Sequence, residues 1–259
     1  MKIIICVKQV PDTETQIRLG ADGKSITEEA VKWIVSPYDE FAIEEGLQIR
    51  EARDGEVIVV SLGPERAQSA IRTCLAMGAD SGVHLLDAAF DDLDAMGTAR
   101  CLAAAIRQLE PYDLVLTGQQ GVGGDNSQIP GLLAELLDLP QVTMAVKVGL
   151  GDDSANVERE VEGARERWQT SLPAVISAQK GLNAPRYASL KGIMKAKKKP
   201  LDVKDAAALG LDPDVLLPKT RIVKLELPPP RPAVKMIEGD PGQQSAELLR
   251  LLHEEAKVI

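Results

Sequence analysis

The chain has 259 residues, of which 44% are hydrophobic and 27% charged, and its formal net charge is -9. This length suits one large α/β domain with appendages or two small domains, and the apolar fraction is sufficient for a sizeable core. Because an acidic surface repels the phosphates of DNA and RNA, the charge argues against a nucleic-acid partner.

Cysteine and histidine are scarce. Cys6, Cys74 and Cys101 are widely spaced, and His84 and His253 are the two histidines. A zinc or iron–sulfur site therefore lacks ligands, a disulfide framework is not indicated, and no nucleophile–base triad is visible. No apolar run approaches about 20 residues. We expect a cytoplasmic protein without membrane insertion, and we interpret His84 as a structural residue at the edge of a strand.

Short β-branched apolar runs alternate with helical patterns at least four times, which favours a Rossmann-like α/β fold. Such a fold has a parallel sheet with helices on both faces, and its ligands bind past the carboxyl ends of the strands. The predicted strands are Ile3–Val7, Val57–Leu62, Val83–Leu86, Leu114–Thr117, Val142–Val148 and Val175–Ala178. The predicted helices are Tyr38–Arg53, a segment from Pro64 to about Gly78, Leu93–Leu109 and Asp125–Leu137.

A stretch of alternating charge precedes the last of these strands. It contains Glu158, Glu160, Glu162 and Glu166 together with Arg159, Arg165 and Arg167. Such alternation is typical of a solvated face or a surface hairpin, so we do not assign catalysis to these carboxylates.

The alternation of strands and helices stops at about Ala184. The remaining chain holds the basic run Lys197–Lys199, the proline-rich stretch Leu227–Pro232 and a narrow leucine stripe in Ser245–Glu255. We therefore expect a nucleotide-binding domain at 1–183 and, at 184–259, an extended arm with a helix that wraps a partner. The alternative is a tail that packs on its own domain.

The loop Gly118–Gln128 follows a predicted strand and precedes a helix. Its glycines permit close backbone approach to a ligand, and Asp125, Asn126 or Ser127 can cap the helix. The free N–H groups at the start of that helix would suit a phosphate, whereas Asp125 would contact a ribose hydroxyl or cap the helix. The alternative is a flexible strand-to-helix turn without a ligand. The basic run Lys197–Lys199 also has two alternative interpretations. It could bind phosphate or an acidic partner, or it could be a solvated turn.

Several blocks together resemble the β subunits of electron-transfer flavoproteins, in order and over nearly the whole chain. The block Leu182–Lys199 is similar to that family's recognition loop, and Val157–Gly163 followed by Leu172–Ser177 resembles its signature. Shorter matches lie at Cys6–Thr13, Ser36–Asp39, Ser61–Pro64 and Arg72–Asp80.

The resemblance implies an adenine nucleotide alpha hydrolase-like fold and a heterodimer with an α subunit that carries the redox FAD. It also implies that the β subunit contributes to the wall around that flavin and holds a nucleotide of its own, either AMP or a second FAD. The cofactor-binding positions implied are Cys6, Ser36, Tyr38, Leu62, Gly63, Gly123, Gly124, Asp125, Asn126, Ser127, Gln128 and Ile129.

The same resemblance implies docking to an acyl-CoA dehydrogenase or a similar flavin dehydrogenase, with Leu190 as the anchor. The docking positions are Arg186, Tyr187, Leu190, Ile193 and Met194. The expected function is an electron carrier that passes electrons from such a dehydrogenase to an acceptor, without catalytic residues or a metal.

The alternative function is electron bifurcation, in which the second FAD oxidises NADH. The loop matches neither the AMP-type nor the bifurcating pattern fully, because Gly123 replaces the first aspartate; Ser36, Ala164 and Trp168 also depart from the family. Leu139–Thr143 and Glu254–Ile259 resemble the branch that includes bifurcating members. A third hypothesis is an unrelated stress-type nucleotide-binding protein with the same fold, which would form a homodimer without flavin.

Overall fold

The computed structural model describes residues 1–29, 31–231 and 233–259. Pro232, at the end of the predicted proline-rich stretch, lies outside the described residues. The chain forms two compact units, Met1–Val223 and Lys224–Ile259.

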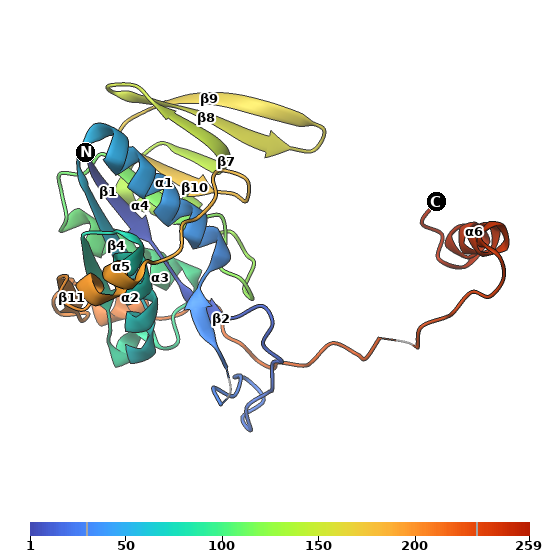
Figure 1. Cartoon of the computed structure of the whole chain (residues 1–259). Helices are drawn as coiled ribbons and strands as arrows, with labels where there is room; N and C mark the ends of the chain where they lie inside the picture. Colours follow the sequence, from blue (N-terminus) through green and yellow to red (C-terminus); the bar gives the residue numbers. More distant parts are fainter. Residues whose placement is uncertain (30, 232) are drawn as a thin grey trace. The chain divides into compact units, whose positions relative to one another are not determined.

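A nine-stranded sheet forms the centre of the first unit (Figure 1). Its strand order is β11-β5-β4-β1-β6-β10-β7-β8-β9. Neighbouring strands from β11 to β7 are parallel, and β8 and β9 continue the sheet as an antiparallel hairpin. The strands are β1 (Lys2–Cys6), β4 (Glu56–Leu62), β5 (Ser81–Leu85), β6 (Leu114–Gly118), β7 (Gln141–Leu150), β8 (Ser154–Val161), β9 (Ala164–Ser171), β10 (Ala174–Ala178) and β11 (Leu201–Lys204).

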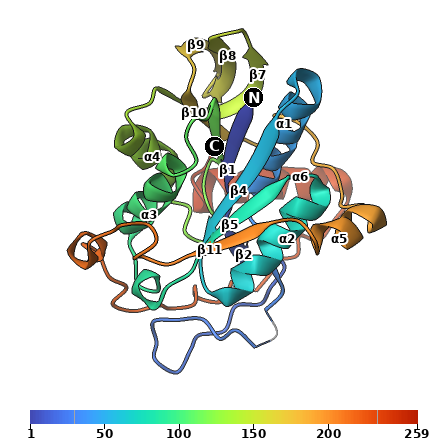
Figure 2. The same ribbon diagram turned by 90° about the vertical axis from the view of Figure 1, so that its left-hand side faces the viewer.

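Helices cover both faces of this sheet (Figure 2). On β1, Ile3 and Ile5 belong to one buried cluster, with apolar residues of α1 and α2, whereas Ile4 and Cys6 belong to the other, with α3 and α4. Successive strand residues point to opposite faces, so strands covered on both sides read as continuous apolar runs. The helices are α1 (Pro37–Arg53), α2 (Gln68–Met77), α3 (Ala95–Arg107), α4 (Ile129–Leu137) and α5 (Leu190–Ala196).

The predicted α/β fold is confirmed, and six predicted strands and four predicted helices are present with small shifts of their ends. The shift that matters for the predicted ligand loop concerns α4, which begins at Ile129 rather than Asp125. The expected cap by Asp125, Asn126 or Ser127 is wrong, because Gln128 is the N-cap residue and makes no side-chain cap hydrogen bond. Asp125 and Ser127 instead have left-handed backbone angles, with φ of 46° and 51°, which keep the loop out of the helix.

The expectation that alternation ends at about Ala184 is also wrong. α5 packs on α2, and β11 adds a further parallel strand beside β5. Lys199 explains part of this arrangement, because its Nζ donates to the carbonyl oxygens of Leu75, Gly78 and Ala79 at the end of α2. Residues from 184 to 223 therefore belong to the first unit, and Lys199 is part of its packing rather than of a solvated turn.

Three further details concern the strands. The charge-alternating stretch forms the predicted hairpin, β8 and β9. A two-stranded ribbon that the sequence did not indicate, β2 (Gln9–Pro11) and β3 (Trp33–Val35), follows β1. His84 lies fully buried within β5, between β4 and β11, and not at an edge.

The second unit contains α6 (Pro241–Arg250) and a continuing π-helical turn, Leu251–Glu255. Asp240 and Gln243 form a reciprocal capping box at its start. The predicted helix at the C-terminal leucine stripe is therefore confirmed, and Leu248 and Leu249 are exposed on it. Whether this unit wraps a partner stays a prediction. In the described part of the chain, the helices are too short or too polar to traverse a bilayer.

Candidate functional site

A cavity of about 600 Å³ lies at the carboxyl ends of three neighbouring parallel strands. Cys6 ends β1, Leu62 ends β4 and Thr117 lies near the end of β6, and all three line the cavity. The chain leaves β1 toward β4 and later returns to the other side of β1 as β6, so the order of the strands reverses here. Open α/β sheets bind ligands at such a switch point, and the volume falls within the range of ligand sites.

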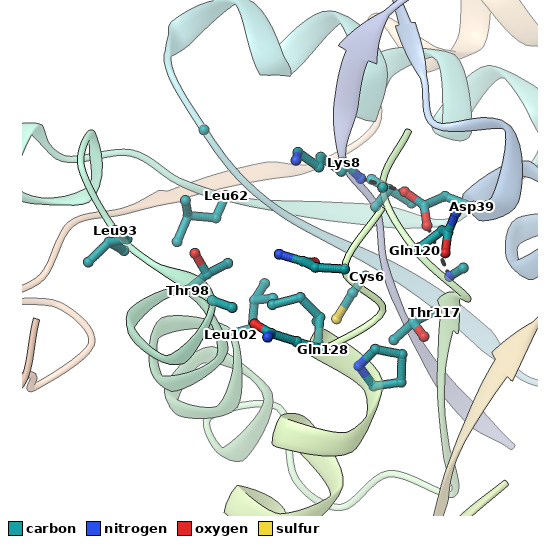
Figure 3. A pocket seen from close by; sticks show the side chains of 18 of the residues that line it. Cys6, Lys8, Asp39, Leu62, Leu93, Thr98, Leu102, Thr117, Gln120 and Gln128 are labelled. Atoms are coloured by element: carbon teal, nitrogen blue, oxygen red, sulfur yellow. Dashed lines mark hydrogen bonds between the residues drawn. The ribbon is translucent and has the colours of Figure 1, made fainter. Parts of the chain in front are cut away.

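The two sides of the cavity differ in character (Figure 3). Leu62, Leu93 and Leu102 make one side apolar, with Thr98 of α3 beside them. Asp94 caps α3 through Oδ1, which accepts from the amide of Gly97 at 2.9 Å. The opposite side is formed by the polar end of β6 and the loop that follows it, so a ligand with one apolar and one polar end fits between them.

The loop between β6 and α4 is braced by its own side chains. Gln120 Nε2 donates to Asp125 Oδ1 at 2.9 Å, and Ser127 Oγ donates to Gln120 Oε1 at 2.8 Å. Asp125 is thereby turned toward Gln120 and does not line the cavity. Gln128 and Ile129 do line it, and they place the start of α4, which lacks a side-chain cap, at its wall. The unpaired N–H groups and positive dipole end of a helix start attract anions.

Asp39 connects the two strands on either side of the switch point. Its Oδ2 accepts from the amide of Lys8 at 2.7 Å, and its Oδ1 accepts from the amide of Gly118 at 2.9 Å. Burial raises the pKa of this carboxyl to about 7, against the lowering effect of the two backbone hydrogen bonds. The carboxyl also lines the cavity.

Two cationic side chains, Lys8 and Arg66, also line the cavity. The Arg66 guanidinium lies over the ring of Trp33 at 3.6 Å from its centroid and donates to Glu28 at 2.8 Å and to Gln9 at 3.0 Å. These contacts fasten the β2–β3 ribbon and the segment around Glu28 beside the cavity. Arg66 is therefore held in one orientation rather than being a mobile surface charge.

The thiol of Cys6 is not suited to covalent chemistry. Burial, assisted by the nearby Asp39 carboxyl, raises its pKa to about 12, so it is uncharged at neutral pH. Cys74 and Cys101 are buried and unpaired as well. Over residues 1–29, 31–231 and 233–259, no cluster of three histidine, cysteine or carboxylate side chains could hold a metal ion.

The structure brings together seven of the twelve predicted cofactor positions, which line the cavity: Cys6, Leu62, Gly63, Asn126, Ser127, Gln128 and Ile129. The other five do not line it: Ser36, Tyr38, Gly123, Gly124 and Asp125. Ser36 is buried as the N-cap residue of α1, and the backbone of Tyr38 packs against Gly118.

The predicted docking positions form a separate group on and before α5. Tyr187 and Leu190 are 98% and 82% exposed, and Ile193 and Met194 are also exposed. Arg186 differs, because its guanidinium is held by Glu44 and Glu51 of α1. It anchors the loop to α1, and its part in docking stays a prediction.

Many of the cavity residues were not predicted, among them the polar or charged residues Lys8, Asp39, Arg66 and Thr117. The sequence could have indicated Asp39 as a cavity residue, because it lies in the first turn of a predicted helix that begins beside the predicted ligand-binding edge of the sheet. Arg66 follows the end of the predicted strand Val57–Leu62, but the orientation of its guanidinium depends on the unpredicted ribbon.

Comparison with known proteins agrees with this architecture. The family model described as electron transfer flavoprotein domain matches residues 24–209. The electron transfer flavoprotein subunit beta of Bacillus subtilis is 40% identical over 260 residues, covering 100% of both chains. Its human counterpart is 40% identical over 241 residues, covering 92% of this chain and 93% of the relative. That of Thermoanaerobacterium thermosaccharolyticum is 38% identical over 257 residues, covering 98% of each. The chain thus belongs to the electron transfer flavoprotein family, as a β subunit.

Proposed function

We propose that this β subunit binds an adenine nucleotide in the cavity at the switch point and pairs with an electron transfer flavoprotein α subunit. In that heterodimer it passes electrons between a flavin dehydrogenase, such as an acyl-CoA dehydrogenase, and an acceptor. The observation that carries the proposal is the position of the uncapped start of α4 at the wall of a cavity about 600 Å³ in volume.

The residues present fit a nucleotide. The start of α4 suits a phosphate, and the apolar side formed by Leu62 and Leu93 suits a base. Thr117 Oγ1 and Gln119 Oε1, both of residues that line the cavity, have no hydrogen-bond partner among the described atoms. Buried polar atoms of this kind are normally satisfied, so a polar ligand is consistent with them.

FAD in this cavity is the second candidate, and with it electron bifurcation from NADH. A second hollow of about 460 Å³ shares Asp94, Ala95 and Gln128 with the main cavity and extends to Thr220. This hollow gives a ligand longer than AMP room past the start of α3. When bound, such a flavin would supply the redox chemistry, while the residues of this chain would bind and orient it.

The redox FAD of the heterodimer, carried by the α subunit, belongs to the same proposal. Tyr38 is the residue we assign to its neighbourhood. Docking to the dehydrogenase is assigned to the exposed loop around Leu190, and docking to the α subunit to the C-terminal arm. The cytoplasmic location expected from the sequence also belongs to this proposal.

The test is acid release of ligands from the purified αβ complex, followed by chromatography. One FAD and one AMP per heterodimer would establish the carrier role and rule out bifurcation by this site. Two FADs per heterodimer would establish the alternative. A complex with one FAD and no second nucleotide would overturn the assignment of the cavity.

A further inference from the structure

Lys8 brings a cation without a partner to the cavity. It follows the end of β1, is exposed and lines the cavity. Its amide donates to Asp39, whereas its Nζ makes neither a hydrogen bond nor an ion pair in the part of the chain that the structure describes. Figure 3 shows the side chain extending from the Asp39 end of the cavity toward the side of Leu62.

Two contacts set the course of the Lys8 side chain. The amide of Lys8 donates to Asp39 Oδ2 at 2.7 Å, and the other oxygen of this carboxylate accepts from the amide of Gly118 at 2.9 Å. The backbone of Lys8 is therefore tied to the start of the loop between β6 and α4. Gly121 in that loop leaves room for the side chain, because a Cβ at this position would lie 2.9 Å from Cδ and 3.4 Å from Nζ of Lys8. The ammonium group consequently lies beside the loop that leads to α4.

The second cation that lines the cavity, Arg66, is already engaged. Its Nε and Nη2 donate to Glu28 at 3.1 and 2.8 Å, and its Nη1 donates to Gln9 at 3.0 Å. Glu28 lines the same cavity and balances the charge of the guanidinium. Of these two cations, Lys8 is therefore the one available to an anionic ligand.

We propose that the Lys8 ammonium binds the phosphate of the nucleotide, together with the uncapped start of α4. This inference rests on the proposed nucleotide site and deepens it. A helix start contributes N–H groups and a partial positive charge, whereas a phosphate monoester carries a charge of about -1.5 to -2 at pH 7. A lysine adds a full positive charge and donors that can turn toward a phosphate oxygen. The site then selects a phosphate-bearing nucleotide over the corresponding nucleoside.

The test compares AMP with adenosine, which lacks the phosphate, on the nucleotide-depleted αβ complex. Calorimetric titration gives the dissociation constants for the wild type, Lys8→Met and Lys24→Met. Methionine keeps the length of the side chain without its charge. Lys24 is also exposed but does not line the cavity, so its substitution controls for the change in net charge.

We expect Lys8→Met to weaken AMP binding by about tenfold or more, because a hydrogen bond to a charged group is lost, and to leave adenosine binding unchanged. Lys24→Met should leave both unchanged. Raising the KCl concentration should weaken AMP binding more steeply in the wild type than in Lys8→Met. Where the complex binds FAD in place of AMP, the same loss is expected for FAD.

Equal affinity of Lys8→Met and the wild type for the nucleotide would overturn the inference. An equal loss for AMP and adenosine would also overturn it, since that result indicates a structural role for Lys8. If the wild type binds neither AMP nor FAD, the proposed nucleotide site is contradicted instead.

Discussion

Arg186 and Glu44 are joined by a two-pronged ion pair, in which Nε donates to Oε2 at 2.8 Å and Nη2 to Oε1 at 3.0 Å. Glu44 is buried on α1, whereas Leu190, four residues after Arg186, is largely exposed. The pair therefore fixes the base of the loop and leaves its tip free. Burial raises the pKa of Glu44, but the hydrogen bonds from Arg186 and Gln48 outweigh it and hold the pKa below its usual value.

We predict that Arg186→Met destabilises the first unit by about 1–3 kcal/mol at pH 7, because it leaves Glu44 buried without a charge partner. Thermal unfolding of the αβ complex measures this loss. The matched control is Glu51→Gln, which removes the half-exposed partner of the same guanidinium and costs no more than about 1 kcal/mol. Equal melting temperatures for Arg186→Met and the wild type would show that the pair does not hold the loop.

Leu190→Ala tests the docking assignment. Because Leu190 is exposed, we expect no change in the unfolding transition, but a drop of about tenfold or more in kcat/KM when the complex accepts electrons from its dehydrogenase. The maximal rate at saturating complex should be retained. Val203→Ala, a half-exposed apolar residue on β11, is the control and should leave kcat/KM unchanged. An unaltered kcat/KM for Leu190→Ala would remove Leu190 as the anchor.

The regular part of the first unit could be predicted from local patterns. Runs such as Ile3–Val7 are apolar throughout because both faces of the sheet are covered, and the glycine-rich loop marks the end of β6. β11 could not be predicted, because Leu201–Lys204 has two exposed positions among its four residues and becomes a strand only by pairing with β5. Whether such a short segment at the edge of a sheet forms a strand depends on its tertiary contacts more than on its local sequence.

The candidate site, too, could be predicted from the sequence only in part. The loop 118–128 was predicted because glycines and a following helix are visible in sequence. The start of α4 was misplaced because Asp125 and Ser127 adopt left-handed backbone angles, which sequence preference does not specify for residues other than glycine. Arg66 follows the carboxyl end of β4, and its guanidinium is oriented by contacts with Trp33, Glu28 and Gln9 that the sequence does not indicate.

Gly118→Ala should disrupt the switch point. A Cβ at this position would lie 2.3 Å from Asp39 Oδ1 and 2.7 Å from the carbonyl carbon of Tyr38, and the backbone of α1 cannot move aside cheaply. We expect a loss of about 1–3 kcal/mol in the free energy of unfolding, as for overpacked cores, together with loss of bound nucleotide. Gly124→Ala in the same loop is the control, because its nearest neighbour would be 4.0 Å away. Equal stability of the two variants would contradict the close packing of α1 against β6.

The raised pKa of Asp39 also predicts how the stability of the nucleotide-free protein depends on pH. The folded state holds this proton up to about pH 7, while the unfolded state releases it near 3.8. The contribution of Asp39 to stability is therefore complete below pH 3.8 and is lost as the pH rises to about 7. Urea unfolding at several pH values should show a smaller decline over this window for Asp39→Asn than for the wild type. Parallel curves would show that Asp39 is already ionised in the folded protein.

His84 contributes to the wall of the cavity through a hydrogen bond to a residue that lines it. Its Nε2 donates to the carbonyl oxygen of Gly63 at 2.9 Å, and Gly63 lines the cavity at the end of β4. His84→Leu leaves this carbonyl without its partner, so we expect a loss of about 1–3 kcal/mol and weaker nucleotide retention after gel filtration. His84→Gln can place an amide N–H near the position of Nε2 and should restore part of both properties. If His84→Leu retained nucleotide as well as the wild type, the hydrogen bond to Gly63 would have no part in shaping the site.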